Sequence, residues 1–501
     1  MTKLTIAATD LGAESGRVAR VDFDGQSLEL GVVRRFPHTP WDDNGRLRWN
    51  MEFLWGEISE GLAELADDAT VASVGVDTFG VDYGLFDSAG ALIEDPLTYR
   101  EAGRSDAFDK AVDSLGREHL YMATGTQVAP INTVFGLAAD QERRPELLAS
   151  ATRFLMLPDL FHTRLAGSTV TEYTMVSTSG MYDMAKDEWA WGLIDELGIP
   201  RHLFPEVATP GTSLGLVRGD LAHGGLSNTQ VILPAAHDTA SAVVSIPRVD
   251  QACMFISSGT WSLVGVVTPS PVVTPETYRF NLTNEAGYPN NIRLIRNLMG
   301  LWMLQECRRA WVKEGDDRDY AELVALAENE PILRSMVDPA DNAFLAPGDM
   351  PSRIQDYCAQ AGFPVPQSKG EIVRTIIDSL AMSYRIAAED LRVASGQAID
   401  SIRVVGGGGN NTLLQQATAD AAGIPVITGA TEATVLGNAA VQLMALGEIA
   451  SLEQAWDVIS ASVSERTYTP RNTEAYDARA EEFRSLQARV LAGRRTEGAT
   501  G

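Results

Sequence analysis

The sequence predicts an α/β protein of two domains that share one repeated folding unit. An apolar, β-branched segment at 4–9 turns through 10–16 into a second strand at 17–23, and the same strand-turn-strand pattern recurs at 252–267. The chain has 501 residues, which is more than a single hydrophobic core usually supports. The recurrence near mid-chain therefore indicates an internal duplication, with one copy opening each half.

Charge and cysteine content narrow the possible partners. The 40 Lys and Arg are outnumbered by 67 Asp and Glu, which gives a net charge of -27 at pH 7. Such a surface repels nucleic acid and anionic membranes, and no segment is apolar for long enough to predict a signal peptide or a membrane span. The three cysteines lack metal-ligand spacing and indicate reduced thiols. We expect a cytoplasmic protein; the sequence leaves monomer and homodimer open.

The first strand leads into a turn whose composition suits a phosphate group. Asp10 ends the strand, and 11–16 supply two glycines, a hydroxyl and a second acid. Backbone amides in such a turn converge on anions, while Asp10 is a candidate to hold a hydrated metal ion. A plain β-turn is the alternative.

A second turn follows a predicted helix at 51–65 and a predicted strand at 71–76. The segment from Asp77 to Asp82 carries two acids and Gly80. Carboxylates accept hydrogen bonds from sugar hydroxyls, so the segment is interpreted as a polyol-binding turn.

The middle of the chain holds the candidate catalytic acid. An apolar strand at 231–233 leads to Asp238, and small residues follow at 239–242, where they leave room for a ligand. A carboxylate in this setting is placed to accept a proton. A helix cap at Asp238 is the alternative interpretation.

The second half adds a glycine cluster. A periodic helix at 371–393 ends at Gly396, and a strand at 401–405 precedes Gly406–Gly409 and a further helix at 412–422. Glycines between strand and helix permit close backbone approach to a flat or anionic ligand. Residues 491–501 are expected to form a disordered tail.

Common nucleotide motifs are excluded by inspection. A P-loop needs Gly-Lys-Ser or Gly-Lys-Thr, and none of the five lysines is followed by Ser or Thr. The His-Arg-Asp loop of protein kinases is absent, and the glycines at 406–409 lack the later glycine of a dinucleotide fingerprint. The remaining candidate for a nucleotide site is a pair of phosphate-binding turns, one in each lobe.

Six segments, in order, together resemble the FGGY carbohydrate kinases of the actin-like ATPase superfamily: 10–17, 75–82, 237–242, 257–262, 297–302 and 406–408. The resemblance implies a duplicated, ribonuclease H-like fold with the active site in the cleft between domains. We place a sugar-binding N-terminal domain at 1–246, with the catalytic base near its end, and a nucleotide-binding C-terminal domain at 247–490.

The same resemblance implies ATP-dependent phosphorylation of a small ketose, with Mg²⁺ as cofactor. Asp238 would be the general base, and Asp10 would hold Mg²⁺ through water. The residues implied to contact ATP are Ala13, Glu14, Ser15, Gly16, Arg17, Thr260, Gln305 and Gly407. Those implied to contact the sugar are Gly80, His237, Asp238, Thr239 and Asn297.

One departure bears on which ketose is used. The family pattern Tyr-Arg-Asp-x-Arg-Thr is replaced here by Tyr99-Arg-Glu-Ala-Gly-Arg104. The other segments favour L-rhamnulose, phosphorylated at O1, and L-fuculose, L-ribulose and D-xylulose are the alternatives. Two other classes compete: a nucleotide-driven switch on the same fold, and an oxidoreductase built on Gly406–Gly409.

Overall fold

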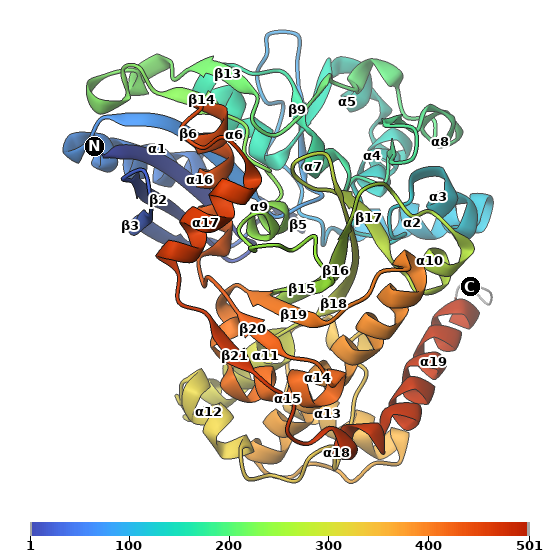
Figure 1. The fold of residues 1–501 in the computed structure, drawn as a ribbon. Helices are drawn as coiled ribbons and strands as arrows, with labels where there is room; N and C mark the ends of the chain where they lie inside the picture. The colour runs from blue at the N-terminus through green and yellow to red at the C-terminus, as the bar shows by residue number, and fades with distance from the viewer. Residues whose placement is uncertain (1–2, 498–501) are drawn as a thin grey trace. The chain divides into compact units, whose positions relative to one another are not determined.

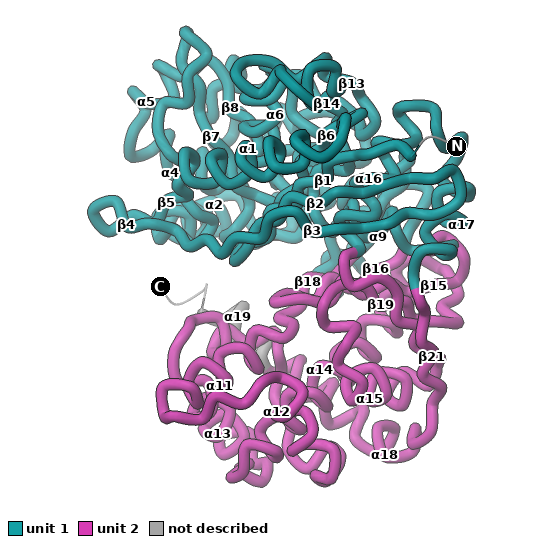
Figure 2. The backbone as a smooth tube through the Cα atoms, turned by 90° about the vertical axis from the view of Figure 1, so that its left-hand side faces the viewer, with its two compact units in different colours: residues 1–248, 267–294, 433–463 teal, residues 249–266, 295–432, 464–501 magenta. Residues whose placement is uncertain are grey.

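The computed structural model describes residues 3–497, and they form two compact units (Figure 2). Unit 1 comprises Met1–Arg248, Val267–Leu294 and Ala433–Val463, and unit 2 comprises Val249–Val266, Ile295–Glu432 and Ser464–Gly501. The chain thus crosses between units several times. A single division at 246/247 leaves out 267–294 and 433–463, which pack with the first half.

Unit 1 is built on a six-stranded sheet in the order β13-β14-β6-β1-β2-β3 (Figure 1). Strand β1 pairs antiparallel with β2 and parallel with β6, and β6 pairs parallel with β14. The strands are β1 (Leu4–Leu11), β2 (Ser15–Phe23), β3 (Leu28–Pro37), β6 (Val71–Thr78), β13 (Ser213–Leu216) and β14 (Gln230–Ile232).

Alternation along β6 separates the two faces of this sheet. Val74 and Val76 pack into a core formed with α1 (Met51–Asp68) and α6 (Leu157–Ala166). The intervening residues, Ser73, Gly75 and Asp77, face α16 (Ala433–Ala445) instead. Helix α16 therefore covers the opposite face, although more than 350 residues separate it from β6 in sequence.

The second large sheet repeats the first and confirms the predicted duplication. Its order is β17-β18-β16-β15-β19-β20-β21. Strand β15 pairs antiparallel with β16 and parallel with β19, β19 pairs parallel with β20, and β20 pairs antiparallel with β21. The run β18-β16-β15-β19-β20-β21 corresponds to β3-β2-β1-β6-β14-β13. These strands are β15 (Cys253–Ser258), β16 (Trp261–Thr268), β17 (Thr283–Ala286), β18 (Ile292–Met299), β19 (Ser401–Val405), β20 (Val426–Thr428) and β21 (Arg466–Tyr468).

The helix expected at 371–393 is α14 (Lys369–Ser395), and its ends follow from local chemistry. Ser368 and Glu371 form a reciprocal capping box at its start, and Gly396 adopts a left-handed conformation at its end. The expected tail overlaps α19 (Ala480–Glu497), so the helix covers 491–497, and 498–501 lie outside the described residues. Among the described residues, no helix combines the length and apolar character needed to cross a membrane.

The other elements are shorter connections. The strands are β4 (Trp41–Asp43), β5 (Arg46–Arg48), β7 (Tyr83–Phe86), β8 (Arg153–Met156), β9 (Thr171–Glu172), β10 (Tyr182–Asp183), β11 (Glu188–Trp189) and β12 (Val207–Ala208). The helices are α2 (Ala102–Leu115), α3 (Arg117–Thr124), α4 (Thr133–Arg143), α5 (Pro145–Ser150), α7 (Tyr173–Val176), α8 (Trp191–Glu196), α9 (Asp238–Val244), α10 (Pro275–Arg279), α11 (Trp302–Lys313), α12 (Tyr320–Ala327), α13 (Met350–Ala361), α15 (Thr412–Ala422), α17 (Leu452–Ser462) and α18 (Thr473–Asp477).

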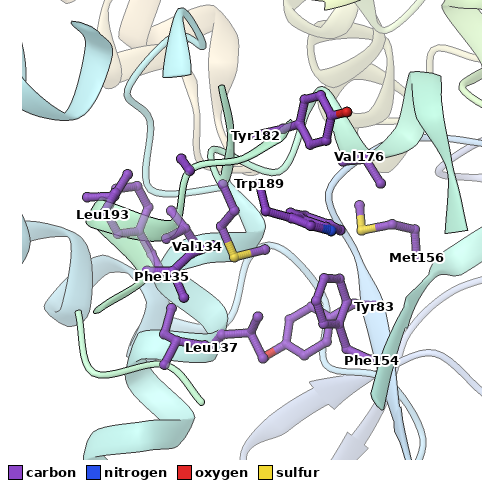
Figure 3. Close-up of a cluster of buried hydrophobic side chains, with 14 of the residues drawn as sticks. Tyr83, Val134, Phe135, Leu137, Phe154, Met156, Val176, Tyr182, Trp189 and Leu193 are labelled. Atoms are coloured by element: carbon purple, nitrogen blue, oxygen red, sulfur yellow. The ribbon is translucent and has the colours of Figure 1, made fainter. Parts of the chain in front are cut away.

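A second core in unit 1 supports the loops that carry polar groups. Figure 3 shows its aromatic centre, where Trp189 and Phe154 stack edge to face at 5.8 Å between ring centroids. The same buried cluster includes Ala236, Ala286 and Ile292. Each of these precedes or follows a polar site residue described below, so the core fixes the backbone on which those residues stand.

Candidate active site

Three acids of unit 1 follow or end neighbouring strands at one edge of its sheet. Asp10 and Asp77 are register partners on the parallel strands β1 and β6. Thr78 forms a parallel bridge with His237, which places the adjacent Asp238 next in the row. The carboxyl ends of parallel strands are where ligands bind in open α/β sheets. The structure therefore brings the predicted base and the predicted metal residue together.

Asp238 is the most accessible of the three acids. Its side chain is 29% exposed, and its Oδ1 accepts hydrogen bonds from the backbone N (2.5 Å) and the Oγ1 (3.2 Å) of Thr239. Desolvation and the charge of Asp10 raise the pKa of Asp238 to about 7. The helix-cap interpretation is wrong, because His237 occupies the capping position of α9 and Asp238 is its first helical residue.

Asp77 is fully buried and is held from α16. Asn438 Nδ2 donates to Asp77 Oδ2 at 2.5 Å, and Asn438 Oδ1 accepts from Gln442 Nε2 at 2.6 Å. Gln442 Oε1 in turn accepts from the Ser73 hydroxyl at 2.6 Å. Burial and the charges of Asp10 and Asp238 raise the pKa of Asp77 well above its usual value. Neither amide was predicted from the sequence, although two amides four residues apart in an otherwise apolar helix were a usable signal.

The predicted phosphate turn connects β1 to β2. Ala13 to Ser15 remain partly or fully exposed, whereas Gly16 is buried, and a Cβ added there would overlap the Phe36 ring. Arg17 pairs with Asp10 at 2.5 Å across the strand register. His38 Nε2 lies 2.7 Å from the Gly12 carbonyl oxygen, and this hydrogen bond stabilises the turn. The turn thus offers accessible backbone next to a cation and an acid.

The segment after β6 is tightly constrained. Val81, a β-branched residue, has a φ of 70°, which is a strained left-handed conformation. A Cβ on Gly80 would lie 3.2 Å from His237 Nε2, so this glycine lies against the ring. Asp82 is fully buried and accepts from Trp49 Nε1 (2.7 Å) and Arg104 Nη2 (2.9 Å). The expectation that Asp82 accepts from sugar hydroxyls is therefore wrong.

The segment that departs from the family pattern has structural roles. Glu101 caps α2 by accepting from the backbone N of Gly103 at 2.6 Å. Arg104 is buried, donates to the Ile131 carbonyl at 2.9 Å, and forms the ion pair with Asp82. Glu101 and Arg104 of this segment therefore serve a helix cap and a buried ion pair.

Buried charges surround His237. Arg293 Nη2 lies 3.1 Å from His237 Nδ1 and 3.2 Å from Glu285 Oε2. The backbone N of His237 donates to Thr174 Oγ1 at 3.0 Å, and the Thr174 hydroxyl donates to Glu172 Oε2 at 2.5 Å. Burial raises the pKa of Glu172 to about 8. No sequence pattern had assigned a role to Glu172, Arg293 or Glu285.

Unit 2 gathers the other predicted nucleotide residues. Thr260 lies in the β15–β16 turn, where its carbonyl accepts from the backbone N of Gly300 at 3.0 Å. The glycines after β19 pack on the same hairpin, since a Cβ on Gly406 would lie 2.8 Å from the Ser258 carbonyl. Gly407 is exposed with open space around it. Gln305 Oε1, on α11, is buried without a hydrogen-bond partner in the described chain.

The predicted site residues are therefore divided between the units. Asn297, on β18, belongs to unit 2 together with Thr260, Gln305 and Gly407. Gly80, His237, Asp238, Thr239 and the turn from Ala13 to Arg17 belong to unit 1. Within the described residues, no three His, Cys, Asp or Glu side chains form a direct metal cage.

Comparison with known proteins identifies the family of this chain. A model of the N-terminal domain of the FGGY family of carbohydrate kinases matches residues 5–245, and a model of its C-terminal domain matches residues 254–446. The chain belongs to the FGGY family of carbohydrate kinases. It is accordingly a carbohydrate kinase, an enzyme that uses ATP. The matches cover both halves and support neither the switch nor the oxidoreductase alternative.

Individual FGGY relatives match over nearly the full length. A rhamnulokinase of Bacteroides thetaiotaomicron is 37% identical over 478 residues, covering 95% of this chain and 98% of that one. A rhamnulokinase of Pectobacterium atrosepticum is 38% identical over 491 residues, covering 97% of each.

Solved structures support the FGGY fold. A ligand-bound xylulose kinase from Lactobacillus acidophilus has a TM-score of 0.80 at 16% identity, over 97% of this chain and 98% of that one. A Plasmodium falciparum glycerol kinase with ADP has a TM-score of 0.76 at 15% identity, over 97% and 98% of the two chains. At this identity the likeness concerns the fold alone, and the duplicated α/β class is confirmed.

Proposed function

We propose that this kinase transfers the γ-phosphoryl group of ATP to the O1 hydroxyl of L-rhamnulose, giving L-rhamnulose 1-phosphate and ADP. The observation that carries the proposal is the full-length similarity to relatives named rhamnulokinase, at 35% to 38% identity over 93% to 97% of this chain. The altered segment at 99–104 does not count against this sugar, because Glu101 and Arg104 are engaged in a helix cap and a buried ion pair.

In this proposal Asp238 is the general base. It is accessible enough to reach a substrate, and a pKa of about 7 lets its carboxylate accept a proton at neutral pH. The sugar hydroxyl would lose its proton to Asp238 as it attacks the γ-phosphorus in line. Phosphoryl transfer otherwise needs mainly positioning and charge stabilisation. Gly80, His237, Thr239 and Asn297 are the proposed sugar contacts.

Mg²⁺ fits the acids of unit 1 as a hydrated ion. Asp10 and Asp77 sit side by side, and the charge of Asp10 contributes to the raised pKa of both Asp77 and Asp238, so negative charge accumulates there. Mg²⁺ keeps several waters and needs few protein ligands. We propose that Asp10 holds the ion through water. When bound, the ion would supply charge neutralisation to the phosphates.

The turn from Ala13 to Arg17, with Thr260, Gln305 and Gly407, forms the proposed nucleotide contacts. Exposed backbone in the first turn suits phosphate oxygens. Open space at Gly407 suits close approach of a nucleotide.

The substrate is tested by coupled assay of ADP release with L-rhamnulose, L-fuculose, L-ribulose and D-xylulose. We expect the highest kcat/KM for L-rhamnulose. A higher value for another ketose would replace the substrate while keeping the kinase. ADP release that no ketose stimulates would contradict the proposed function.

Gly80→Val is expected to weaken sugar binding far more than ATP binding. The first added carbon would already lie 3.2 Å from His237 Nε2 and 3.3 Å from Thr178 Oγ1, and the methyl groups would need space held by the ring or the sugar. Isothermal titration with each substrate measures the two affinities. Gly31→Val is the matched control, because Gly31 lies on an exposed strand with nothing within 4 Å of the added atom. A larger loss of ATP affinity would contradict the site assignment.

Gln305→Leu is expected to weaken ATP binding while leaving the free protein as stable or more stable. Gln305 Oε1 is buried without a hydrogen-bond partner in the described chain, so an apolar side chain removes an unmet polar group. Thermal melts with and without ATP measure both effects. Gln442→Leu is the contrasting control: its amide bonds Ser73, Asn438 and the Ala7 carbonyl, and its loss should lower the melting temperature strongly. Unchanged ATP affinity in Gln305→Leu would remove this residue from the nucleotide site.

A further inference from the structure

Arg293 is the most deeply buried cation beside the candidate base. The whole residue has no solvent exposure, and its Nε donates to the Ala286 carbonyl at 3.1 Å. Glu285 Oε2 lies 3.2 Å from Nη2, so a carboxylate and a carbonyl of β17 hold the guanidinium in place. A side chain fixed at this depth has a defined direction, and that direction is toward His237.

The contact between Arg293 and His237 determines which ring nitrogen carries the proton. A guanidinium donates hydrogen bonds and accepts none, and it stays charged in proteins. Nδ1 of His237, 3.1 Å from Arg293 Nη2, must therefore accept. The proton of the neutral ring then resides on Nε2. Burial and the charge of Arg293 also lower the pKa of His237 well below its usual value, which opposes a second proton.

The protonated nitrogen faces the candidate sugar site. His237 Nε2 lies 3.6 Å from Asp238 Oδ1, which is longer than a hydrogen bond. Glu285 lies 3.6 Å from the other nitrogen, Nδ1. Nε2 is also the atom nearest to a Cβ built on Gly80, at 3.2 Å. The Nε2 proton is thus directed to the space between Gly80 and Asp238.

We propose that Arg293, held by Glu285, is a positioning residue that locks His237 in the Nε2-protonated tautomer. His237 then presents a hydrogen-bond donor to an acceptor oxygen of the sugar, a carbonyl or hydroxyl oxygen near the hydroxyl that Asp238 deprotonates. The proposal rests on the proposed function only for the identity of that ligand. Lysine would not serve equally, because its single ammonium lacks the planar fork that meets Ala286, Glu285 and His237 together.

The tautomer is tested directly, without substrate, by long-range ¹H–¹⁵N NMR on full-length protein labelled at histidine. The His237 signals are assigned by their loss in His237→Asn. We expect one neutral, Nε2-protonated form from pH 6 to pH 8. A ring protonated on Nδ1, or an imidazolium in this range, would overturn the proposal even if no Arg293 variant folds.

Variants then test the role of Arg293. Arg293→Met should release the tautomer and raise the KM for the sugar about tenfold, the equivalent of one lost hydrogen bond, with the KM for ATP changed less than about twofold. Arg293→Lys should restore part of the tautomer bias. An unchanged tautomer in Arg293→Met would show that Arg293 does not set it.

Two comparisons separate positioning from general destabilisation. Arg374, also buried, pairs with Asp378 at 2.9 Å, so Arg374→Met should lower stability without changing the His237 tautomer or the KM ratio. Arg293→Met added to His237→Asn should change the KM for the sugar by less than about twofold, because Arg293 acts through the ring. Additive losses would contradict that route. The NMR result does not depend on which sugar the assay panel identifies. The proposed tautomer and the proposed substrate can therefore each be contradicted without the other.

Discussion

Asp238→Asn is expected to lower kcat by about 10²- to 10⁴-fold, the usual contribution of a general base, while ATP still binds. Asparagine keeps the size and polarity of the side chain but cannot accept the proton of the sugar hydroxyl. Steady-state kinetics give kcat, and titration with ATP confirms that the nucleotide still binds. Near-normal turnover in this variant would remove the assigned base.

The wild-type pH profile gives an independent check on the same residue. The pKa of Asp238 is raised to about 7, so the basic form grows as pH rises through 7 and kcat/KM should fall on the acid side of that value.

Folding stability has the opposite trend. A carboxyl with a raised folded-state pKa stabilises the fold at low pH and loses that contribution between about pH 4 and 7. Asp238→Asn should therefore gain stability relative to wild type at pH 8.

Arg104→Met is expected to cost about 3 to 5 kcal/mol of unfolding free energy, a large part of a typical total of about 5 to 15 kcal/mol. It leaves Asp82 buried without its cation. The ion pair already competes with burial, which raises the pKa of Asp82 to about 6 despite Arg104. Chemical denaturation measures the loss, and sugar affinity should fall with it because Asp82 is two residues from Gly80.

Two controls define the cause of that loss. Asp82→Asn combined with Arg104→Met removes both charges and should recover part of the stability. Arg201 forms an ion pair with Asp195 in which both side chains are more than half exposed, so Arg201→Met should lower the unfolding free energy far less than Arg104→Met. Equal losses in Arg104→Met and Arg201→Met would show that burial of the pair contributes nothing.

Features determined by local pattern were predictable. The two strand-turn-strand openings share one pairing scheme in the structure because alternating apolar residues and glycine turns are encoded within about 20 residues of sequence. Helix α14 was equally predictable from its apolar periodicity and the glycine that ends it. The segment around Asp238 was recognisable for the same reason: strand, acid and small residues are contiguous.

Features that depend on contacts between distant segments could not be predicted from the sequence. Asn438 bonds Asp77 across 361 positions, and Arg293 meets His237 across 56, spacings that leave no periodic signal. Asp82 appeared to be a sugar ligand because sequence does not report that Trp49 and Arg104 already occupy its oxygens.

The sequence by itself determined the duplicated α/β fold, the family and the acid proposed as base, because each is encoded by residues that are neighbours in the chain. Only the tertiary structure decided which polar groups are partners and which are left for substrate. Burial forces every charge to find a nearby partner in space, and the choice of partner depends on how separate segments pack.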